Sequence, residues 1–380
     1  MNVCGIDVHK IHLWVHIKDD KGNDVFATTF RRNPKGLQSL KRLCQQNHVS
    51  KAIMESTSTY WKPVYQILDK VRIECAVVNA YQLKVLGKHK TDDRDAELLA
   101  TWGLLNVLNS SFIPSIEVHQ LRELVRTRVA TQNRKGAIIS RMKTMLEGSC
   151  PGVTEALKNL NLLYAQLFLE SWGQQERVNL TFEQWVDTID DGRVRKGLIR
   201  RKSVLGYWWD HPLDKVQQYL LDYQMRQFQF YRDELIMLET LIGTTLDQTD
   251  LKMPVYLIKS IPGIGFLTAV TIAAELGSVE RFNNGREAAA SCGLTPKLKG
   301  SGGKTHTGRI TKHGPKSVRR AVYIACKSVI RFSPSHNEFY QRIKRRRGGK
   351  RALIALCKKL IVQAWTMWSR RELFKANVAA

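Results

Sequence analysis

Short apolar runs separated by polar gaps open the chain. They lie at residues 3–9, 13–17 and 24–30, and the turn-forming residues 21–23 precede the third run. Runs of this length, rich in Val, Ile, Phe and Trp and bounded by polar turns, are typical of β-strands. The pattern therefore predicts three strands in an antiparallel meander.

Amphipathic helices and strands alternate after this meander. Helices are predicted at 34–46, 60–68 and 81–87, and strands at 51–55 and 74–79. These elements give the order βββαβαβα, and a further helix is predicted directly after them. This is the arrangement of a ribonuclease-H-like fold, a mixed sheet covered by helices.

Four carboxylates fall at marked positions of these elements. Asp7 interrupts the first strand, Glu55 ends the fourth, and Asp92 and Asp95 lie in the first turn of the last helix. A carboxylate inside a central strand is costly unless it binds something. Residues three apart share a helix face, so we expect Asp92 and Asp95 to point the same way and Asp93 to point elsewhere.

These carboxylates, if they converge at one end of the sheet, have the chemistry of a magnesium site. Carboxylate oxygens are the ligands that Mg²⁺ prefers, and two ions held there could activate a nucleophile and stabilise the leaving oxygen of a phosphodiester. The acidic turn also has a structural alternative. Thr91 or Asp92 is a good helix N-cap, and carboxylates near a helix N-terminus are favoured by the helix dipole.

Two long helical patterns fill the middle of the chain, at 116–148 and 213–244, and shorter helices are predicted between them at 152–203. The spacing of their apolar residues predicts an antiparallel coiled coil, formed within one chain or shared with a second subunit. The other face of the first helix is basic, and it is either solvated or in contact with nucleic acid. Its basic residues are Arg122, Arg126, Arg128, Arg134, Lys135, Arg141 and Lys143.

Residues 260–273 predict a helix-hairpin-helix. The turn Pro262-Gly263-Ile264-Gly265 could offer backbone N–H groups to a DNA phosphate beside a helix N-terminus. The alternative is a glycine-rich turn between two packed helices.

The segment 288–337 contains no Asp or Glu and many Lys and Arg residues. Within it, Ser301 lies in the glycine-rich stretch 300–304, which we expect to be a loop that a phosphate can approach closely. Lys304, Arg309 and Lys312 could neutralise negative charge on phosphorus, or the loop could bind phosphate passively. A basic run at 342–351 suits a nucleic-acid backbone, and an amphipathic helix at 352–368 is expected to close the domain.

Composition supports a polyanionic partner. The chain has 380 residues, a formal net charge of +26 and a pI near 9.9, which favour nucleic acid. No apolar run is long enough to span a bilayer and no signal peptide opens the chain, so a membrane is not expected. The seven cysteines form no CxxC pair, which indicates a reduced, cytosolic setting. His9, His12 and His16 lack metal-ligand spacing and are expected to be ordinary strand residues.

Three motifs near the N-terminus resemble the DEDD transposases of bacterial insertion sequences. They are Gly5-Ile6-Asp7-Val8-His9-Lys10, Met54-Glu55-Ser56-Thr57-Ser58-Thr59-Tyr60 and Lys90-Thr91-Asp92-x-x-Asp95-Ala96. The N-terminal domain of that family is similar to the RuvC Holliday-junction resolvase, and the Piv DNA invertase is a relative. The resemblance places the metal-binding tetrad on Asp7, Glu55, Asp92 and Asp95.

The C-terminal part is similar to the transposase domain of the same family. The similar segments are Gly293-Leu294-Thr295-Pro296, Ser301-Gly302-Gly303, Ile310-Thr311-Lys312-His313-Gly314 and Arg319-Arg320. The resemblance implies that Ser301 is the nucleophile that forms a phosphoserine link to DNA, whereas Ser291 is expected to be a packing residue. It also implies donor and target DNA, a structured guide RNA encoded by the element, and a dimer or tetramer in the bacterial cytoplasm, associated with the nucleoid.

We therefore expect an α/β RuvC-like catalytic domain at 1–113, a helical coiled-coil arm with an insertion at 114–250, and an all-α transposase domain at 251–380. The expected function is a transposase that recombines DNA by magnesium-assisted transesterification. The alternatives are a RuvC-like nuclease that uses water as nucleophile and a non-catalytic nucleic-acid-binding protein. The expected nucleic-acid contacts are Lys90, Gly263, Gly265, Lys304, Arg309, Lys312, Arg319, Arg320, Arg345, Arg346 and Arg347.

Overall fold

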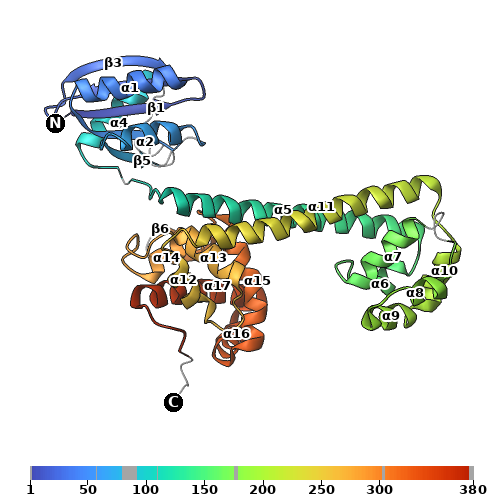
Figure 1. Ribbon diagram of the computed structural model, residues 1–380. Helices are drawn as coiled ribbons and strands as arrows, with labels where there is room; N and C mark the ends of the chain where they lie inside the picture. The colour runs from blue at the N-terminus through green and yellow to red at the C-terminus, as the bar shows by residue number, and fades with distance from the viewer. Residues whose placement is uncertain are drawn as a thin grey trace. The chain divides into compact units, whose positions relative to one another are not determined.

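The computed structural model describes residues 2–56, 58–78, 92–108, 110–174, 179–301 and 304–375, without the side chains of residues 92, 93, 298–301 and 304–307. The chain forms two compact units, Met1–Ile113 and Pro114–Ala380 (Figure 1). Among the described residues, no helix combines the length and the apolar character needed to cross a membrane.

A mixed five-stranded sheet forms the centre of the first unit. Its strands are β1 (Asn2–Val8), β2 (His12–Lys18), β3 (Asp24–Arg31), β4 (Val49–Glu55) and β5 (Glu74–Val78). Their order is β3-β2-β1-β4-β5. The β1–β2 and β2–β3 pairs are antiparallel, whereas the β1–β4 and β4–β5 pairs are parallel. The predicted meander and the two later strands are therefore confirmed, as is the mixed α/β class of this part of the chain.

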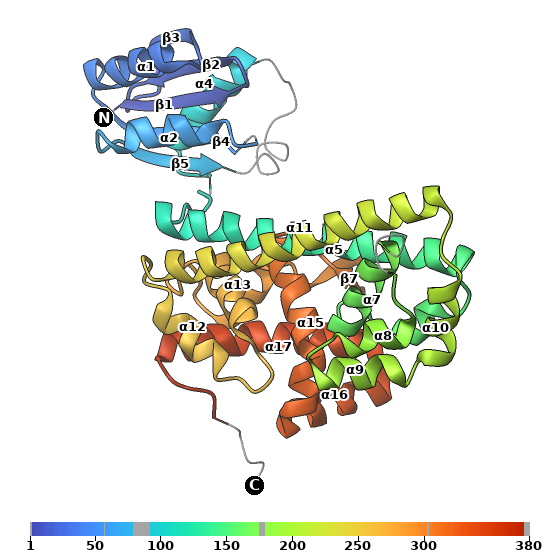
Figure 2. The ribbon, with the colours of Figure 1, turned by 45° about the vertical axis from the view of Figure 1, so that its right-hand side comes forward.

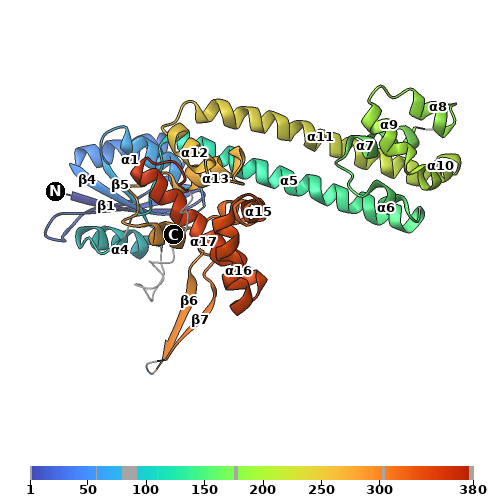
Figure 3. The same ribbon diagram turned by 90° about the horizontal axis from the view of Figure 1, so that it is seen from below.

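Helices cover both faces of this sheet. They are α1 (Pro34–Gln46), α2 (Trp61–Asp69) and α4 (Asp92–Leu104), while the helix expected at 81–87 lies outside the described residues. Ile6 of β1 belongs to the apolar cluster under α1 and α2. Val3 of the same strand packs with Leu99 of α4 in a second cluster. Figure 3 shows α1 and α4 on opposite sides of the sheet, so the central strand β1 is buried on both faces.

An antiparallel pair of long helices, α5 (Ile116–Ser149) and α11 (Lys215–Leu246), forms an arm in the second unit. At 1.5 Å per residue each helix is about 50 Å long. Near one end of the arm Leu121 clusters with Ile242, and near the other Ile138 clusters with Phe228. The two predicted long helices and their pairing within one chain are confirmed (Figure 1).

The insertion between these helices is a small helical subdomain with an aromatic core. Its helices are α6 (Val153–Leu157), α7 (Leu163–Gly173), α8 (Phe182–Asp187), α9 (Gly192–Ile199) and α10 (Lys202–Asp210). The rings of Trp185 and Trp209 stack with centroids 4.7 Å apart, and Phe168 stacks on Trp172 at 5.4 Å. This aromatic core stabilises the fold of the insertion.

Six helices and a hairpin form the C-terminal part of the second unit. The helices are α12 (Lys252–Lys259), α13 (Phe266–Leu276), α14 (Gly285–Ser291), α15 (Lys316–Phe332), α16 (Pro334–Arg347) and α17 (Gly349–Arg370). Figure 2 shows α13, α15 and α17 gathered beneath one end of the arm. Their apolar residues, such as Val270, Val322 and Leu360, share one cluster with Leu121 of α5.

The glycine-rich stretch around Ser301 is not the loop expected from the sequence. It lies in a two-stranded hairpin of β6 (Pro296–Ser301) and β7 (Lys304–Ile310), in which Ser301 pairs with Lys304 (Figure 3). In the sequence Gly302 and Gly303 separate the two strands, and a Gly-Gly pair between alternating residues is a strong hairpin signal. Glycine content alone therefore gave the wrong structure here, because the alternating residues on either side form strands.

A buried carboxylate joins the arm to the C-terminal helices. The side chain of Glu275 in α13 is 2% exposed and accepts two hydrogen bonds from Arg126 of α5, at 2.9 and 2.7 Å. Ser317 of α15 donates to the same carboxylate, and Arg122 donates to the backbone oxygen of Glu275 at 3.2 Å. The hydrogen bond with Glu275 raises the pKa of Arg126, and burial lowers the pKa of Arg122 to about 10. This network fixes α5 against α13 and α15.

We expect Arg126→Met to lower the free energy of unfolding of the second unit by about 3 kcal/mol, since it leaves a buried carboxylate without its main partner. The control is Arg134→Met, an exposed position on the same helix, which should change stability by less than about 0.5 kcal/mol. Hydrogen exchange of α13 and α15 amides during urea unfolding measures both effects. Equal protection in the two variants would contradict the role given to Glu275.

Candidate active site and nucleic-acid contacts

Asp7 and Glu55 lie on neighbouring parallel strands at the same end of the sheet. The register pairs Ile6 with Met54, so the next residues, Asp7 and Glu55, follow side by side at the carboxyl ends of β1 and β4. Successive side chains of a strand alternate between faces. Both carboxylates therefore belong to the face that carries Gly5, which is the face covered by α4.

Gly5 brings the backbone of α4 directly onto the sheet. A Cβ atom at Gly5 would lie 2.0 Å from the carbonyl oxygen of Ala96 and 2.5 Å from the nitrogen of Ala100. Further along α4, Gly103 lies against Ile53 and Val3. The helix therefore runs opposite to β1, and its first turn lies toward the end of the sheet where Asp7 is located.

That first turn carries Asp92, Asp93 and Asp95. The half-buried Asp95 is described, but the side chains of Asp92 and Asp93 are not. Their orientation, and with it the convergence of all four carboxylates, stays a prediction. Lys90 and Thr91 lie outside the described residues.

The carboxylate of Asp7 is 6% exposed and accepts a hydrogen bond from Nε2 of His9 at 2.9 Å. A buried carboxylate is stable only with such partners. His9 was expected to be an ordinary strand residue, yet it lies just beyond β1 and contacts the candidate site. Its spacing of two residues from Asp7 was the signal in the sequence.

Oxygen ligands from three separate elements meet the chemical requirement of a magnesium site. Among the described side chains, which exclude that of Asp92, no group of three His, Cys, Asp or Glu residues is arranged to hold a metal ion. Asp7, Glu55 and Asp95 are described and Asp92 is the member of the predicted set that is not. Since Asp7, Glu55 and Asp95 are described and form no such group, the donor atoms are suitable in kind, but their convergence on an ion stays a prediction.

Ser301 is the last residue of β6, and its side chain is not described, nor are those of Lys304 and His306. Its proposed rival, Ser291, donates a hydrogen bond to the backbone oxygen of Ala288 at 2.8 Å. Its hydroxyl group is therefore hydrogen-bonded within its own helix, as is common for serine in helices. The role of Ser301 stays a prediction.

Packing accounts for one of the two glycines in the predicted phosphate-binding turn. Gly263 has a φ of +91°, and a Cβ atom there would lie 2.5 Å from the backbone nitrogen of Val329 in α15. Gly265 is exposed at the N-cap of α13, with nothing within 4 Å of its Cβ position. Gly265 is therefore the position that a phosphate could approach, whereas Gly263 is needed for the contact with α15.

Some predicted nucleic-acid contacts already have partners within the chain. Arg319 donates to the backbone oxygens of Cys292 and Gly314 at 3.0 and 2.9 Å, and Arg320 donates to the side chain of Asn133. Arg309 and Lys312 are exposed, and so are Arg345, Arg346 and Arg347 in the last turn of α16. The exposed group is the better candidate for phosphate contacts.

The basic face predicted for the first long helix is largely engaged in intramolecular contacts. Arg122 and Arg126 contact Glu275, and Arg128 pairs with Glu239 of α11. The ammonium of Lys135 lies 5.1 Å from the centroid of the Phe228 ring. Helical periodicity could not distinguish these residues from exposed ones, because their partners come from distant parts of the chain.

Two family models match the chain. A model for DEDD transposases of the IS110 group, described as a transposase, matches residues 4–151. A model described as the transposase IS116/IS110/IS902 family matches residues 255–341. The first match contains the strands and helix of the carboxylate site, and the second contains the hairpin with Ser301.

Several curated proteins are similar over parts of their length. The transposase for insertion sequence element IS1111A from Coxiella burnetii is 29% identical over 124 residues, which cover 32% of this chain and 34% of that protein. A probable family 20 transposase from Pseudomonas aeruginosa is 28% identical over 30% of this chain and 36% of that protein. A putative transposase from Sinorhizobium fredii is 23% identical over 71% of this chain and 56% of that protein. The chain thus spans about a third of the length of the first two relatives.

We expect Gly5→Ala to destabilise the first unit by more than about 2 kcal/mol. The new methyl group would collide with backbone atoms of α4, which cannot avoid it by a change of rotamer. The matched control is Gly103→Ala on the same interface, where the methyl group would meet the Cδ1 methyl of Ile53. A side-chain methyl can rotate, so its cost should be smaller. Hydrogen exchange of α4 amides in the full chain compares the two, and faster exchange in Gly103→Ala than in Gly5→Ala would refute the close contact.

Proposed function

The chain belongs to the DEDD transposase family of insertion sequences, and we propose on this basis that it cuts and rejoins DNA to move such an element. The observation that carries the proposal is the pairing of β1 with β4, which makes Asp7 and Glu55 neighbours beneath the first turn of α4. We assign a RuvC-like catalytic domain to 1–113, the arm with its insertion to 114–250, and the serine-bearing transposase domain to 251–380.

Asp7, Glu55, Asp92 and Asp95 would hold two Mg²⁺ ions. When bound, the ions would supply positive charge at a scissile phosphate and lower the pKa of the attacking group. The chain's own contribution is to hold the carboxylates in place. His9 does this for Asp7 through its hydrogen bond, since partners of this kind fix the orientation of a ligand.

Ser301 is the proposed nucleophile. A bond forms between its Oγ and phosphorus while the bond from phosphorus to one deoxyribose oxygen breaks, and the freed oxygen takes up a proton. The hydroxyl of an incoming strand then attacks the phosphoserine, and Oγ leaves with a proton. No bond energy is lost to water, so the reaction needs no high-energy cofactor.

The proposed partners are donor and target DNA, and a structured guide RNA encoded by the element. The net charge of +26 supports binding to both DNA and RNA, which are polyanions. Ser301 and the carboxylates belong to different compact units. A homodimer or homotetramer could therefore combine Ser301 of one subunit with the carboxylates of another. The site of action would be the bacterial nucleoid.

One observation favours a second candidate, a metal-dependent nuclease or junction resolvase that uses water. All four carboxylates belong to one compact unit that does not contain Ser301. Such an enzyme would need the hairpin only to bind phosphate. A covalent link between protein and DNA distinguishes the two functions, because only the serine mechanism forms one.

We expect the wild-type chain to form a covalent adduct with element-end DNA in Mg²⁺ when the element's RNA is present. Ser301→Ala should lose the adduct and keep nucleic-acid binding, since one oxygen is removed. Asp92→Asn should lose at least about 100-fold in activity through loss of a metal ligand, whereas the neighbouring Asp93→Asn should stay close to wild type. Denaturing gel electrophoresis of labelled DNA measures the adduct.

A mixture of Ser301→Ala and Asp92→Asn proteins should recover part of the activity if subunits share sites. An adduct that survives Ser301→Ala would support the water-using nuclease instead. Equal losses in Asp92→Asn and Asp93→Asn would contradict the assignment of Asp92 as a ligand.

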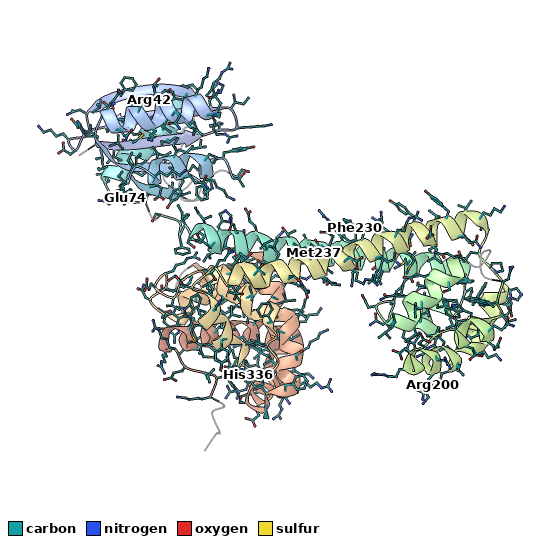
Figure 4. All side chains as sticks on the ribbon, viewed as in Figure 1. Arg42, Glu74, Arg200, Phe230, Met237 and His336 are labelled. Atoms are coloured by element: carbon teal, nitrogen blue, oxygen red, sulfur yellow. The ribbon has the colours of Figure 1, made fainter. Side chains whose placement is uncertain are left out.

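Binding to DNA should weaken steeply with salt, and the exposed arginines at 345–347 should account for part of the dependence. Changing all three to Gln should reduce the slope of log affinity against log salt by about 2.7, at about 0.9 per phosphate contact. The control changes the exposed residues Arg193 and Lys196 of α9 and Arg200 directly after it (Figure 4 labels Arg200). The insertion that carries them has equal numbers of acidic and basic residues between 151 and 213. Fluorescence anisotropy measures both slopes, and equal slopes would refute a specific role for α16.

A further inference from the structure

A cavity of about 130 Å³ lies between four helices of the second unit, α5, α11, α13 and α15. Figure 1 shows α13 and α15 beside the paired helices of the arm. The cavity opens to the surface, because Ile324 in its wall is 56% exposed. Its apolar lining consists of Val125, Val129, Ile242, Leu267, Ala321 and Ile324.

The volume of this cavity suits a single flat ring. An engineered apolar cavity of about 150 Å³ binds benzene. The cavity between the four helices is slightly smaller, so it accommodates one six-membered ring and not the fused rings of a purine. Apolar side chains of the kind found in its wall pack well against the faces of such a ring.

Polar groups are also present in the lining, where they could contact the edge of a ring. They are the amide of Gln132 in α5 and the hydroxyl of Thr268 in α13. Each of these groups can both donate and accept a hydrogen bond. The edge of a pyrimidine base carries hydrogen-bonding groups, so a wall of this composition fits a pyrimidine better than a hydrocarbon ring.

Two guanidinium groups, those of Arg128 and Arg320, line the same cavity. Arg128 uses Nε and Nη2 in its hydrogen bonds to Glu239, and Arg320 uses Nη1 in its hydrogen bond to Asn133. A guanidinium has further N–H donors, which could bind a phosphate group at the mouth of the cavity.

The surface around the mouth favours a polyanion. On α15, Arg320, Lys327 and Arg331 are exposed, and their spacing of seven and four residues places them on one face of the helix. α15 contains no Asp or Glu, and α5 has none between Glu123 and Glu147. Phosphates bound along this basic face would pass the mouth of the cavity.

We propose that this cavity binds the base of one unpaired pyrimidine nucleotide, and that Arg128 and Arg320 hold its phosphate. The inference rests on the nucleic-acid partners of the proposed function and adds a site for a single-stranded segment. A base inside a duplex is stacked and paired, so it must leave the duplex to enter a pocket. RNA and DNA both contain pyrimidines, and the experiment distinguishes the two sources.

Base-dependent binding by the full chain tests the site. The probes are labelled octamers of thymidine, uridine and adenosine, and abasic octamers of either sugar with the same number of phosphates. We expect a pyrimidine octamer to bind at least about tenfold more tightly than its abasic counterpart, since a bound base contributes on this scale. Fluorescence anisotropy measures the dissociation constants, and the tighter of the two pyrimidine octamers identifies the source.

Ala321→Leu fills the cavity with a longer side chain and should lower this pyrimidine preference at least about fivefold. The matched control is Ala130→Leu, the same change at an exposed position of α5 outside the cavity lining, which should keep the preference. Gln132→Leu removes the hydrogen bonds at a similar volume, so it should also lower the preference. It provides the test if thermal melting shows that Ala321→Leu does not fold.

Two results would overturn the proposal. One is a wild-type chain that binds pyrimidine and abasic octamers equally, which is expected if the cavity receives a protein side chain. The other is an equal preference in Ala321→Leu and Ala130→Leu. An equal loss of adenosine-octamer binding in Ala321→Leu would overturn the choice of a pyrimidine.

Photocrosslinking locates the bound base. A 4-thiopyrimidine in the octamer should crosslink under near-ultraviolet light to a peptide of α5, α13 or α15 that lines the cavity, as mass spectrometry identifies it. Crosslinks only to other parts of the chain would overturn the site. Absence of the pyrimidine preference in a wild-type chain that forms the DNA adduct would overturn the cavity site alone. Absence of the adduct in a chain with the preference would count against the proposed function alone.

Discussion

The contact between Gly5 and the backbone of α4 is the constraint on which the carboxylate site depends. It lets a helix lie on the central strand of the sheet with no side chain between them. The helix is then close enough for the residues of its first turn to approach Asp7 and Glu55. Gly5 and Ala96 belong to the same sequence motifs as the carboxylates, so these motifs contain both candidate ligands and the contact that positions them.

The second unit depends on a different kind of interaction. Glu275 is buried and shared by Arg126, Ser317 and the neighbouring Arg122. Buried charges of this kind are stable only when fully paired. The network therefore fixes one end of the arm against α13 and α15, which come from a distant part of the sequence, and the other end of the arm is held by the aromatic insertion.

The two helices of the arm differ in the residues that they expose. The basic residues of α5 are mostly engaged within the chain, with Arg134 and Arg141 among those that stay exposed. The outer face of α11 is apolar.

Most elements of the fold follow from the sequence alone, with the β6–β7 hairpin as an exception, and the chemistry remains a hypothesis drawn from it. Apolar periodicity located the five strands and both long helices, because period and length depend on local residues. Asp7 could be selected because a carboxylate inside a central strand is costly, and Asp92 and Asp95 because residues three apart share a helix face. Family resemblance then named Ser301, which no local pattern distinguishes from a phosphate-binding serine.

The packing, hydrogen-bond and ion-pair partners of these residues became known only from the tertiary structure. Gly263 was expected to be part of a phosphate site, but it packs against α15. Arg122, Arg126 and Arg128 were expected to be solvated or in contact with nucleic acid, but they have carboxylate and backbone partners within the chain. His9 looked ordinary until its contact with Asp7 was found. These contacts join residues distant in sequence or depend on a side-chain direction at a strand end. Burial and long-range pairing are properties of the folded chain, so local patterns could not reveal the contacts of Gly263 and the arginines. The contact of His9 alone left a local signal, its spacing of two residues from Asp7.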